Sequence, residues 1–210
     1  MKDIIDELSA VRRRVGTGPL AAGEARTLTL RRTYDAPVED VWDAITTPER
    51  IARWFLPISG DLRLGGRYQL EGNAGGEILR CEPPHTLKVG WGMGEGDPSE
   101  VEVRLTQVTL DGTELVLEHT ALVPPEMWDT YGPGAVGVGW DLALLGLARH
   151  LRGQSIEESD RDAWSRSDEA KAFMADSATA WAAAHEASGA TAEQANAAAV
   201  HTREFYAPSQ

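Results

Sequence analysis

The chain has 210 residues, of which 42% are hydrophobic and 25% charged, the balance of an ordinary globular protein. Its net charge of −13 would repel phosphate backbones, and no apolar run is long enough to span a bilayer, so we expect neither nucleic acid nor a membrane as a partner. A single cysteine, Cys81, excludes an intrachain disulfide and, with a charged N-terminus unlike a secretory signal, favours the cytoplasm.

Residues 1–25 predict a short amphipathic helix followed by a linker. Apolar residues recur at helical spacing over residues 3–15, with acidic groups early and three arginines late, as the helix dipole favours. The run from Gly16 to Pro19 predicts the end of this helix. Because so short a helix is marginal in water, its apolar stripe must pack on the main domain or on a second subunit.

A strand and a bent helical element open the main domain, which we place at residues 26–153. Leucines alternate with polar residues over 26–34, as in a strand. A helix then follows that Pro48 interrupts, because the residue before a proline avoids helical geometry. The second short helix leads into Trp54 and Phe55, an aromatic surface that predicts a lid or brace over a concave face.

Several strands are expected in succession after this element. They cover residues 60–64, 67–72, 77–81, 86–91, 100–105 and 115–122. Gly65-Gly66 and Asp111-Gly112 have the composition of hairpin turns, and residues 92–99 form a glycine-rich, acidic loop.

A long apolar helix follows, opened by Gly139. Trp140, Leu144, Leu147 and Leu151 form one stripe along it, and burying each leucine would contribute about 1.5–3 kcal/mol. Successive strands followed by a buried helix predict an α+β domain whose twisted antiparallel sheet wraps around that helix.

Residues 154–210 predict an alanine-rich helical hairpin, with a turn at Ser188-Gly189 and a capping box from Thr191 to Gln194. Its large apolar side chains need more burial than two helices provide, so they must pack on the same chain or across a dimer interface. These side chains are Phe173, Met174, Trp181, Phe205 and Tyr206. We expect a homodimer through the terminal helices.

Five segments, in this order, resemble the SRPBCC (START-like) superfamily, in the branch named for the activator of heat shock protein 90 ATPase homologue. They are residues 33–55, 65–68, 82–91, 115–122 and 139–140. The resemblance implies a helix-grip fold, a curved antiparallel sheet around a long C-terminal helix. It also implies a cavity that in related families holds hydrophobic or aromatic small molecules.

The candidate ligand-binding residues are the aromatic and apolar side chains that could line such a cavity, with one histidine. They are Trp54, Phe55, Tyr68, Trp91, His119, Met127, Trp128, Tyr131, Trp140 and Leu144. An apolar pocket with a few polar groups is typical of ligand sites. The alternative is that most of the tryptophans simply fill the core.

His119 is the main polar candidate, because it shares strand parity with Leu115 and Leu117 and so faces inward. It could bond a ligand, act as an acid or base, or be satisfied structurally. Tyr68, Glu77 and Asp141 are possible companions, although Asp141 more simply stabilises a helix terminus.

The sequence indicates no metal site, cofactor or catalytic motif, since five histidines are scattered and no serine lies in a nucleophile elbow. The leading hypothesis is therefore the binding of a hydrophobic or aromatic small molecule. The alternatives are an enzyme of the polyketide cyclase or dehydratase type and, third, a chaperone partner. For the last, the 25 residues before the domain are too few for the separate N-terminal domain of the eukaryotic activators.

Overall fold

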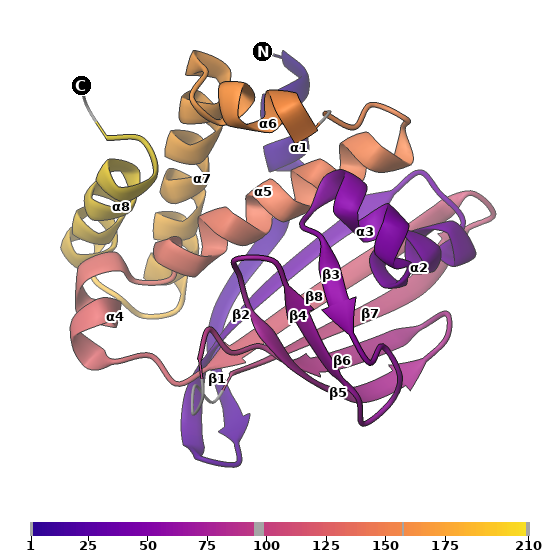
Figure 1. The fold of residues 1–210 in the computed structure, drawn as a ribbon. Coiled ribbons are helices and arrows are strands. Elements are labelled where there is room, and N and C mark those ends of the chain that lie inside the picture. Colours follow the sequence, from indigo (N-terminus) through magenta and orange to yellow (C-terminus); the bar gives the residue numbers. More distant parts are fainter. Residues whose placement is uncertain (1, 95–98, 157, 209–210) are drawn as a thin grey trace.

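A curved antiparallel sheet dominates the computed structural model, which describes residues 2–94, 99–156 and 158–208 (Figure 1). Its strands are β1 (Arg12–Leu20), β2 (Gly23–Tyr34), β3 (Ile58–Gly60), β4 (Arg67–Leu70), β5 (Gly75–Glu82), β6 (Thr86–Gly90), β7 (Ser99–Thr109) and β8 (Gly112–Ala121). Their order across the sheet is β1-β2-β8-β7-β6-β5-β4-β3. Residues 95–98 of the expected glycine-rich loop lie outside the described residues.

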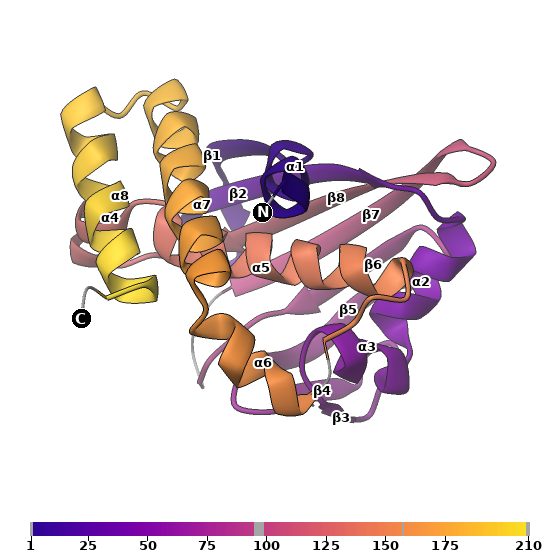
Figure 2. The same ribbon diagram turned by 90° about the horizontal axis from the view of Figure 1, so that it is seen from above.

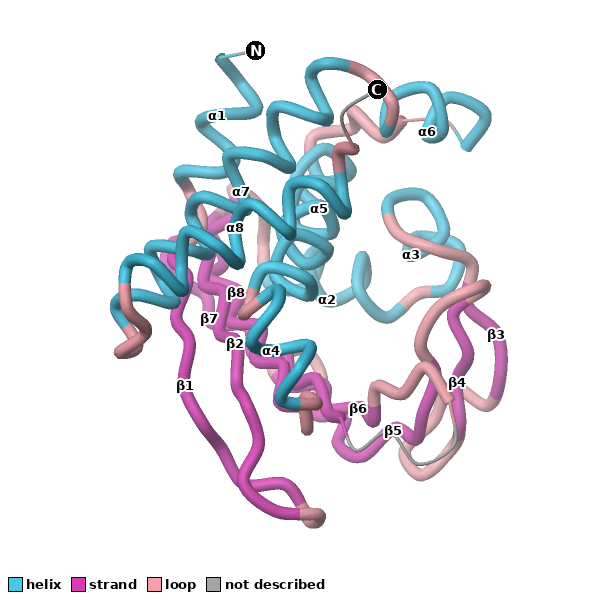
Figure 3. Tube along the Cα trace, turned by 90° about the vertical axis from the view of Figure 1, so that its left-hand side faces the viewer, coloured by secondary structure: helices cyan, strands magenta, loops and turns pink. Residues whose placement is uncertain are grey.

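The helices gather on one side of this sheet, and α5 lies across it (Figure 2). They are α1 (Lys2–Ser9), α2 (Val38–Thr46), α3 (Pro48–Trp54), α4 (Pro125–Tyr131), α5 (Gly134–Leu151), α6 (Glu158–Ser165), α7 (Asp168–Ala187) and α8 (Ala192–Tyr206). The sheet is curved, and α5, α2 and α3 lie over its concave side (Figure 3). The α+β helix-grip arrangement is thus confirmed. No helix among the described residues is both long and apolar enough to cross a membrane.

The bent helical element forms as expected, with Pro48 in the first turn of α3. Its two helices bury different residues: Val41 and Ala44 of α2 are fully buried, and Ile51 of α3 is 6% exposed. The chain leaves α3 at Phe55, which brings the aromatic end of the element beside the concave face of the sheet.

The N-terminal segment differs from the expected helix and linker. The helix ends at Ser9, and Arg12–Leu20 forms β1, an edge strand that pairs with β2. Val11 and Val15 are four residues apart, which puts them on one face of a helix or of a strand alike, so periodicity did not separate the two. Pro19 fits because an edge strand need not use every backbone N–H. The linker prediction for this segment was wrong.

The long helix begins at Gly134, five residues before the expected start. Its early glycines lie under side chains of the C-terminal extension, as a Cβ atom on Gly137 would be 2.2 Å from Cε2 of Trp181. Another glycine, Gly146, lets the end of α3 approach closely, since a Cβ there would be 2.6 Å from the carbonyl oxygen of Trp54. The helix therefore meets the extension closely at Gly134 and Gly137, and α3 at Gly146.

The C-terminal extension contains the expected hairpin, α7 and α8, with the capping box between Thr191 and Gln194. It also contains α6, which was not expected. Within the described chain, Trp181 is fully buried against α5, and Phe173 joins a small core with Ile4, Leu8 and Leu145. These side chains pack on their own chain, whereas Phe205 is 66% exposed. The homodimer stays a prediction.

A buried carboxylate connects these parts. Asp141 of α5 accepts hydrogen bonds from Arg13 Nη2 at 2.9 Å, from Ser177 Oγ at 2.5 Å and from Trp181 Nε1 at 3.0 Å. Burial raises the pKa of Asp141, and these donors oppose the rise. Asp141 lies in the second turn of α5, so the expectation that it stabilises the helix terminus was wrong. It joins β1, α5 and α7.

Candidate functional site

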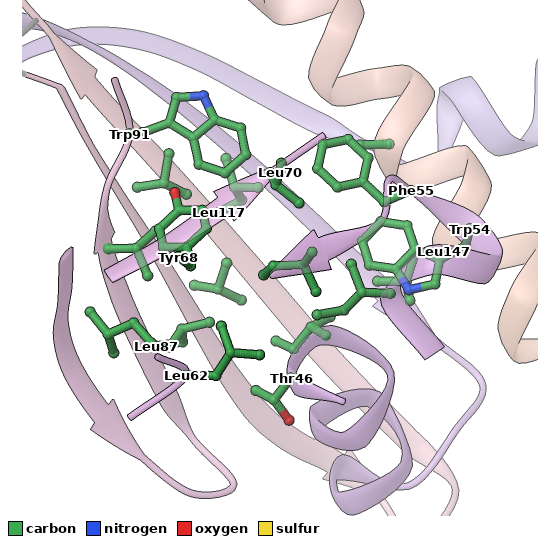
Figure 4. Close-up of a pocket in the computed structure, with 18 of the residues that line it drawn as sticks. Thr46, Trp54, Phe55, Leu62, Tyr68, Leu70, Leu87, Trp91, Leu117 and Leu147 are labelled. Carbon is green, nitrogen blue, oxygen red and sulfur yellow. The ribbon is translucent and has the colours of Figure 1, made fainter. Parts of the chain in front are cut away.

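A cavity of about 190 Å³, here called the inner cavity, lies between the concave face of the sheet and α5. Among the residues that line it are Tyr68, Leu87, Val103, Leu117, Leu144 and Leu147. Figure 4 shows Trp91, Tyr68 and Leu87 on one side of this space and Phe55 and Trp54 across from them. The bent element thus supplies one wall of the cavity and the sheet supplies the other.

Aromatic rings line one end of the inner cavity in a continuous series. Trp54 stacks on Phe55 with a centroid separation of 5.5 Å, and Phe55 lies 6.4 Å from Trp91. Trp91 in turn lies 4.9 Å from Trp140 of α5. Each ring presents apolar surface at the position where a flat ligand ring could lie.

Several polar groups on these walls are bound to the protein itself. The indole N–H of Trp54 donates to the Ala44 carbonyl at 2.9 Å, and the Tyr68 hydroxyl donates to the Gly90 carbonyl at 2.8 Å. The Thr46 hydroxyl donates to Trp42 at 2.7 Å, and exposed Arg63 pairs with Asp61 at 2.8 Å. Burial raises the pKa of Tyr68 well above its usual value, so this phenol keeps its proton.

A second cavity of about 430 Å³, here called the outer cavity, adjoins the first. Phe55, Trp91 and Trp140 line both, so they form the wall between them. Ser99 and His119 bring polar groups to the outer cavity from β7 and β8. Strand pairing positions these two, because Ser99 lies opposite Ala121, two residues beyond His119.

His119 is held by two hydrogen bonds that determine its tautomer. The indole N–H of Trp140 donates to Nδ1 at 2.9 Å, so Nδ1 is an acceptor and carries no proton. The ring proton is therefore on Nε2, which lies 2.7 Å from Ser99 Oγ and donates to it. Burial lowers the pKa of His119 to about 4, so the ring is neutral at pH 7.

This geometry excludes a serine nucleophile activated by His119. A general base needs a free lone pair directed at the hydroxyl proton, whereas His119 presents an N–H to Ser99. The proton of Tyr68 is likewise committed to a backbone carbonyl.

The C-terminal extension also contacts the end of α3 from the side away from the cavity. Arg161 of α6 donates to the carbonyl of Ala52 at 2.7 Å and to that of Phe55 at 2.9 Å. These are carbonyls of the last turn of α3, where a cation is also favourable to the helix dipole. The position of Phe55 on the wall between the two cavities thus depends on a residue more than a hundred positions away.

The structure brings most of the expected site residues together. Trp54, Phe55, Tyr68, Trp91, Trp140 and Leu144 line the inner cavity, and His119 and Met127 line the outer one. His119 faces inward on β8, as its strand parity predicted, and is 6% exposed.

Three expected residues lie elsewhere. Trp128 and Tyr131 line neither cavity, because α4 turns them toward the extension, where Trp128 lies 5.4 Å from His185 and Tyr131 lies 6.0 Å from Phe205. Glu77 is exposed on β5 and is no companion of His119. In the residues the structure describes, no three histidine, cysteine or carboxylate side chains gather as a metal ion would require.

Comparison with known proteins gives a family for the central part of the chain. The family model described as "Activator of Hsp90 ATPase homolog 1-like protein" matches residues 35–152. A search of curated proteins gave no match.

Solved structures extend the similarity beyond that region. The crystal structure of CalU16 from Micromonospora echinospora is 42% identical, with 84% of this chain and 99% of that chain covered and a TM-score of 0.68. DynU16, described as a protein of the dynemicin biosynthetic locus, is 25% identical over 61% of this chain and 48% of that chain, with a TM-score of 0.53. PFC0360w, an HSP90 activator from Plasmodium falciparum, is 23% identical over 60% and 96%, with a TM-score of 0.53, a likeness of fold alone.

Proposed function

The chain belongs to the Activator of Hsp90 ATPase homolog 1-like family, and from this premise we propose that it binds an apolar or aromatic small molecule in the inner cavity. The observation that carries the proposal is the lining, which consists mainly of leucine, valine and aromatic side chains, with the Trp54 indole and the Tyr68 hydroxyl bonded within the protein. Such walls favour an apolar occupant through burial, at about 25 cal/mol per Å².

The size of the inner cavity indicates the scale of that occupant. A dry apolar cavity of roughly 150 Å³ is large enough for benzene. At about 190 Å³ the inner cavity therefore suits one ring or a short branched chain. A larger ligand would extend past Phe55 and Trp91 into the outer cavity.

Binding is better supported than catalysis. An enzyme of the polyketide cyclase or dehydratase type needs an acid or base that can exchange a proton with its substrate. Both nitrogens of His119 and the hydroxyl of Tyr68 have partners inside the protein. DynU16 is a protein of a biosynthetic locus, which supports a small-molecule ligand for this chain too. The likeness to the Plasmodium protein concerns the fold, and we propose no chaperone role.

The test is displacement of the ligand by a side chain that fills the cavity. Val103 of β7 lines the inner cavity, and Val108 of the same strand is 52% exposed outside it. We expect Val103→Trp to weaken binding of toluene, a single-ring probe followed by NMR titration, at least tenfold and Val108→Trp to leave it unchanged. Equal affinity of the three proteins would refute the proposal.

A further inference from the structure

We infer that the outer cavity is the polar half of the ligand site and that the Ser99 hydroxyl donates a hydrogen bond there to an uncharged carbonyl oxygen. This inference rests on the proposed function. It assigns a chemical class to the ligand, an apolar body that bears a neutral carbonyl group. Ser99 is the residue that would select it.

The Ser99 hydroxyl accepts one hydrogen bond and has a hydrogen of its own to donate. Trp140 donates to His119, and His119 donates to Ser99, so the serine oxygen is already an acceptor. The hydrogen of the Ser99 hydroxyl is therefore free to be donated. Among the described residues the Ser99 side chain makes no other hydrogen bond, and Ser99 lines the outer cavity. A ligand acceptor in that cavity would complete the chain of donors.

The chain of donors also fixes and strengthens this hydroxyl. Successive hydrogen bonds polarise one another in a site of low dielectric constant. His119 is 6% exposed and Trp140 is 8% exposed, so water has little access to the first two members. Ser99 itself begins β7, which pairs with β8, and a donor on a paired strand is held more rigidly than one on a loop.

The charge of the outer cavity indicates that the acceptor is uncharged. Among the described residues that line it, none is Asp, Glu, Lys or Arg, and His119 is neutral at pH 7. A carboxylate or phosphate would enter without a counter-charge, and burying an unpaired ion is very costly. A ketone, ester or amide oxygen needs only the one donor that Ser99 offers.

The other polar groups of the outer cavity leave this assignment in place. The Tyr206 hydroxyl donates to the Ala135 carbonyl at 2.6 Å, so its hydrogen is used. The side-chain oxygen of Asn73 accepts from the backbone N–H of Ala74 at 2.7 Å. The Asn73 amide nitrogen and the indole N–H of Trp91, which also lines this cavity, donate to no acceptor among the described residues. They are further available donors, which makes Ser99 variants the necessary test.

The shared wall places the apolar body of the ligand. Phe55, Trp91 and Trp140 face both cavities, and Trp140 also donates to His119. A ring packed on these aromatic faces would hold a carbonyl group attached to it on the Ser99 side. The two cavities would then recognise the two halves of one molecule.

The experiment compares two probes that differ by one group. The probes are 2-acetonaphthone and 2-ethylnaphthalene, in which CH₂ replaces the carbonyl, measured against the native chain, Ser99→Ala and Ser99→Thr. We expect Ser99→Ala to raise the ratio of the ketone Kd to the hydrocarbon Kd about three- to tenfold, the value of one neutral hydrogen bond. Ser99→Thr, which keeps the hydroxyl, should restore the native ratio.

A second readout detects the hydrogen bond itself. The infrared carbonyl stretch of bound 2-acetonaphthone should lie at lower frequency in the native chain and in Ser99→Thr than in Ser99→Ala. If Ser99 had only a structural role, Ser99→Ala would weaken binding of both probes equally and leave the carbonyl frequency unchanged. That result would overturn the inference. Suppose that both probes bind, that Val103→Trp weakens both, and that the ratio of the two Kd values is the same in the native chain and in Ser99→Ala. The inference then fails and the proposed function stands. If toluene binds the native chain but neither naphthalene does, the inference alone fails. If none of the three binds, the proposed function fails and the inference with it.

Discussion

Trp181 lies directly on Gly137, so that a Cβ atom on this glycine would be 2.2 Å from Cε2 of the indole ring. The same indole donates from Nε1 to Asp141, one turn further along α5, at 3.0 Å. A glycine and a carboxylate on one face of the central helix thus seat the C-terminal extension. The extension is part of the packed core and carries buried polar contacts of its own.

Gly137→Ala should therefore destabilise the protein although alanine favours a helix. The added methyl group overlaps a fully buried ring, and overpacking of this kind costs about 1–3 kcal/mol. Gly139→Ala is the matched control, because its Cβ would meet only the Tyr206 hydroxyl at 3.4 Å and should be neutral or stabilising by up to about 1 kcal/mol. Denaturant unfolding measures both. Equal stability of the two variants would contradict the contact.

Arg13→Met should cost about 3–5 kcal/mol, because it leaves the fully buried Asp141 carboxylate without its counter-charge. The neighbouring Arg12 is exposed on the same strand. Arg12→Met should change the free energy of unfolding by less than about 0.5 kcal/mol. A small, equal effect of both substitutions would show that the ion pair contributes little.

His119 should make stability fall in acid. Its pKa is lowered by burial from 6.5 to about 4, so between these values the unfolded chain binds a proton that the folded chain does not. Stability is therefore lost as pH falls from about 6.5 toward 4. At pH 4.5 the His119 contribution should reach about 2–3 kcal/mol.

The His119→Asn variant isolates that contribution, because every other residue is the same in the two proteins. The free energy of unfolding should fall less between pH 7 and pH 4.5 in the variant than in the native chain. Nitrogen NMR of the native chain at pH 7 should show a neutral ring protonated at Nε2. Identical pH profiles for the two proteins would rule out the lowered pKa.

Arg161→Met should make the last turn of α3 more mobile without unfolding the domain. It removes both donors to the last turn of α3, and hydrogen bonds from a charged group contribute about 1.5–3 kcal/mol each when buried. Because Arg161 is only half-buried, we expect backbone amides near Phe55 to exchange about tenfold faster. Arg166→Met, at an exposed position, is the control. Unchanged exchange near Phe55 would mean that α3 is held by α5 alone.

The sequence was sufficient for the elements whose own residues mark their limits. Pro48 separates α2 from α3, and Thr191 with Gln194 begins α8, because proline and a capping box act through local backbone geometry. The start of α5 could not be found in this way. Gly134 and Gly137 have the composition of a loop, and only contact with Thr202 and Trp181 explains glycine there.

The site was predictable in its apolar part and less so in its polar part. Alternation along β8 placed His119 inward, since strand periodicity is a local property. Ser99 was missed because it follows a glycine-rich loop and its role depends on the pairing of β7 with β8. The hairpin at Asp111-Gly112 could not supply the register of Ser99, because an irregularity between Gln107 and Thr109 shifts the pairing by one residue. Nothing in the residues around Trp128 and Tyr131 indicated that α4 turns toward the extension.

The small core shared by α1 and α7 has a consequence for how the chain is made. Ile4 and Leu8 pack with Leu145 and Phe173, so residues from the two ends of the chain complete one cluster. At about 5–20 residues per second, a ribosome adds Phe173 on the order of ten to thirty seconds after Leu8. During that interval Ile4 and Leu8 of α1 lack their contact with Phe173, even if the sheet has already formed. The first helix to be synthesised is thus among the last to be fully packed.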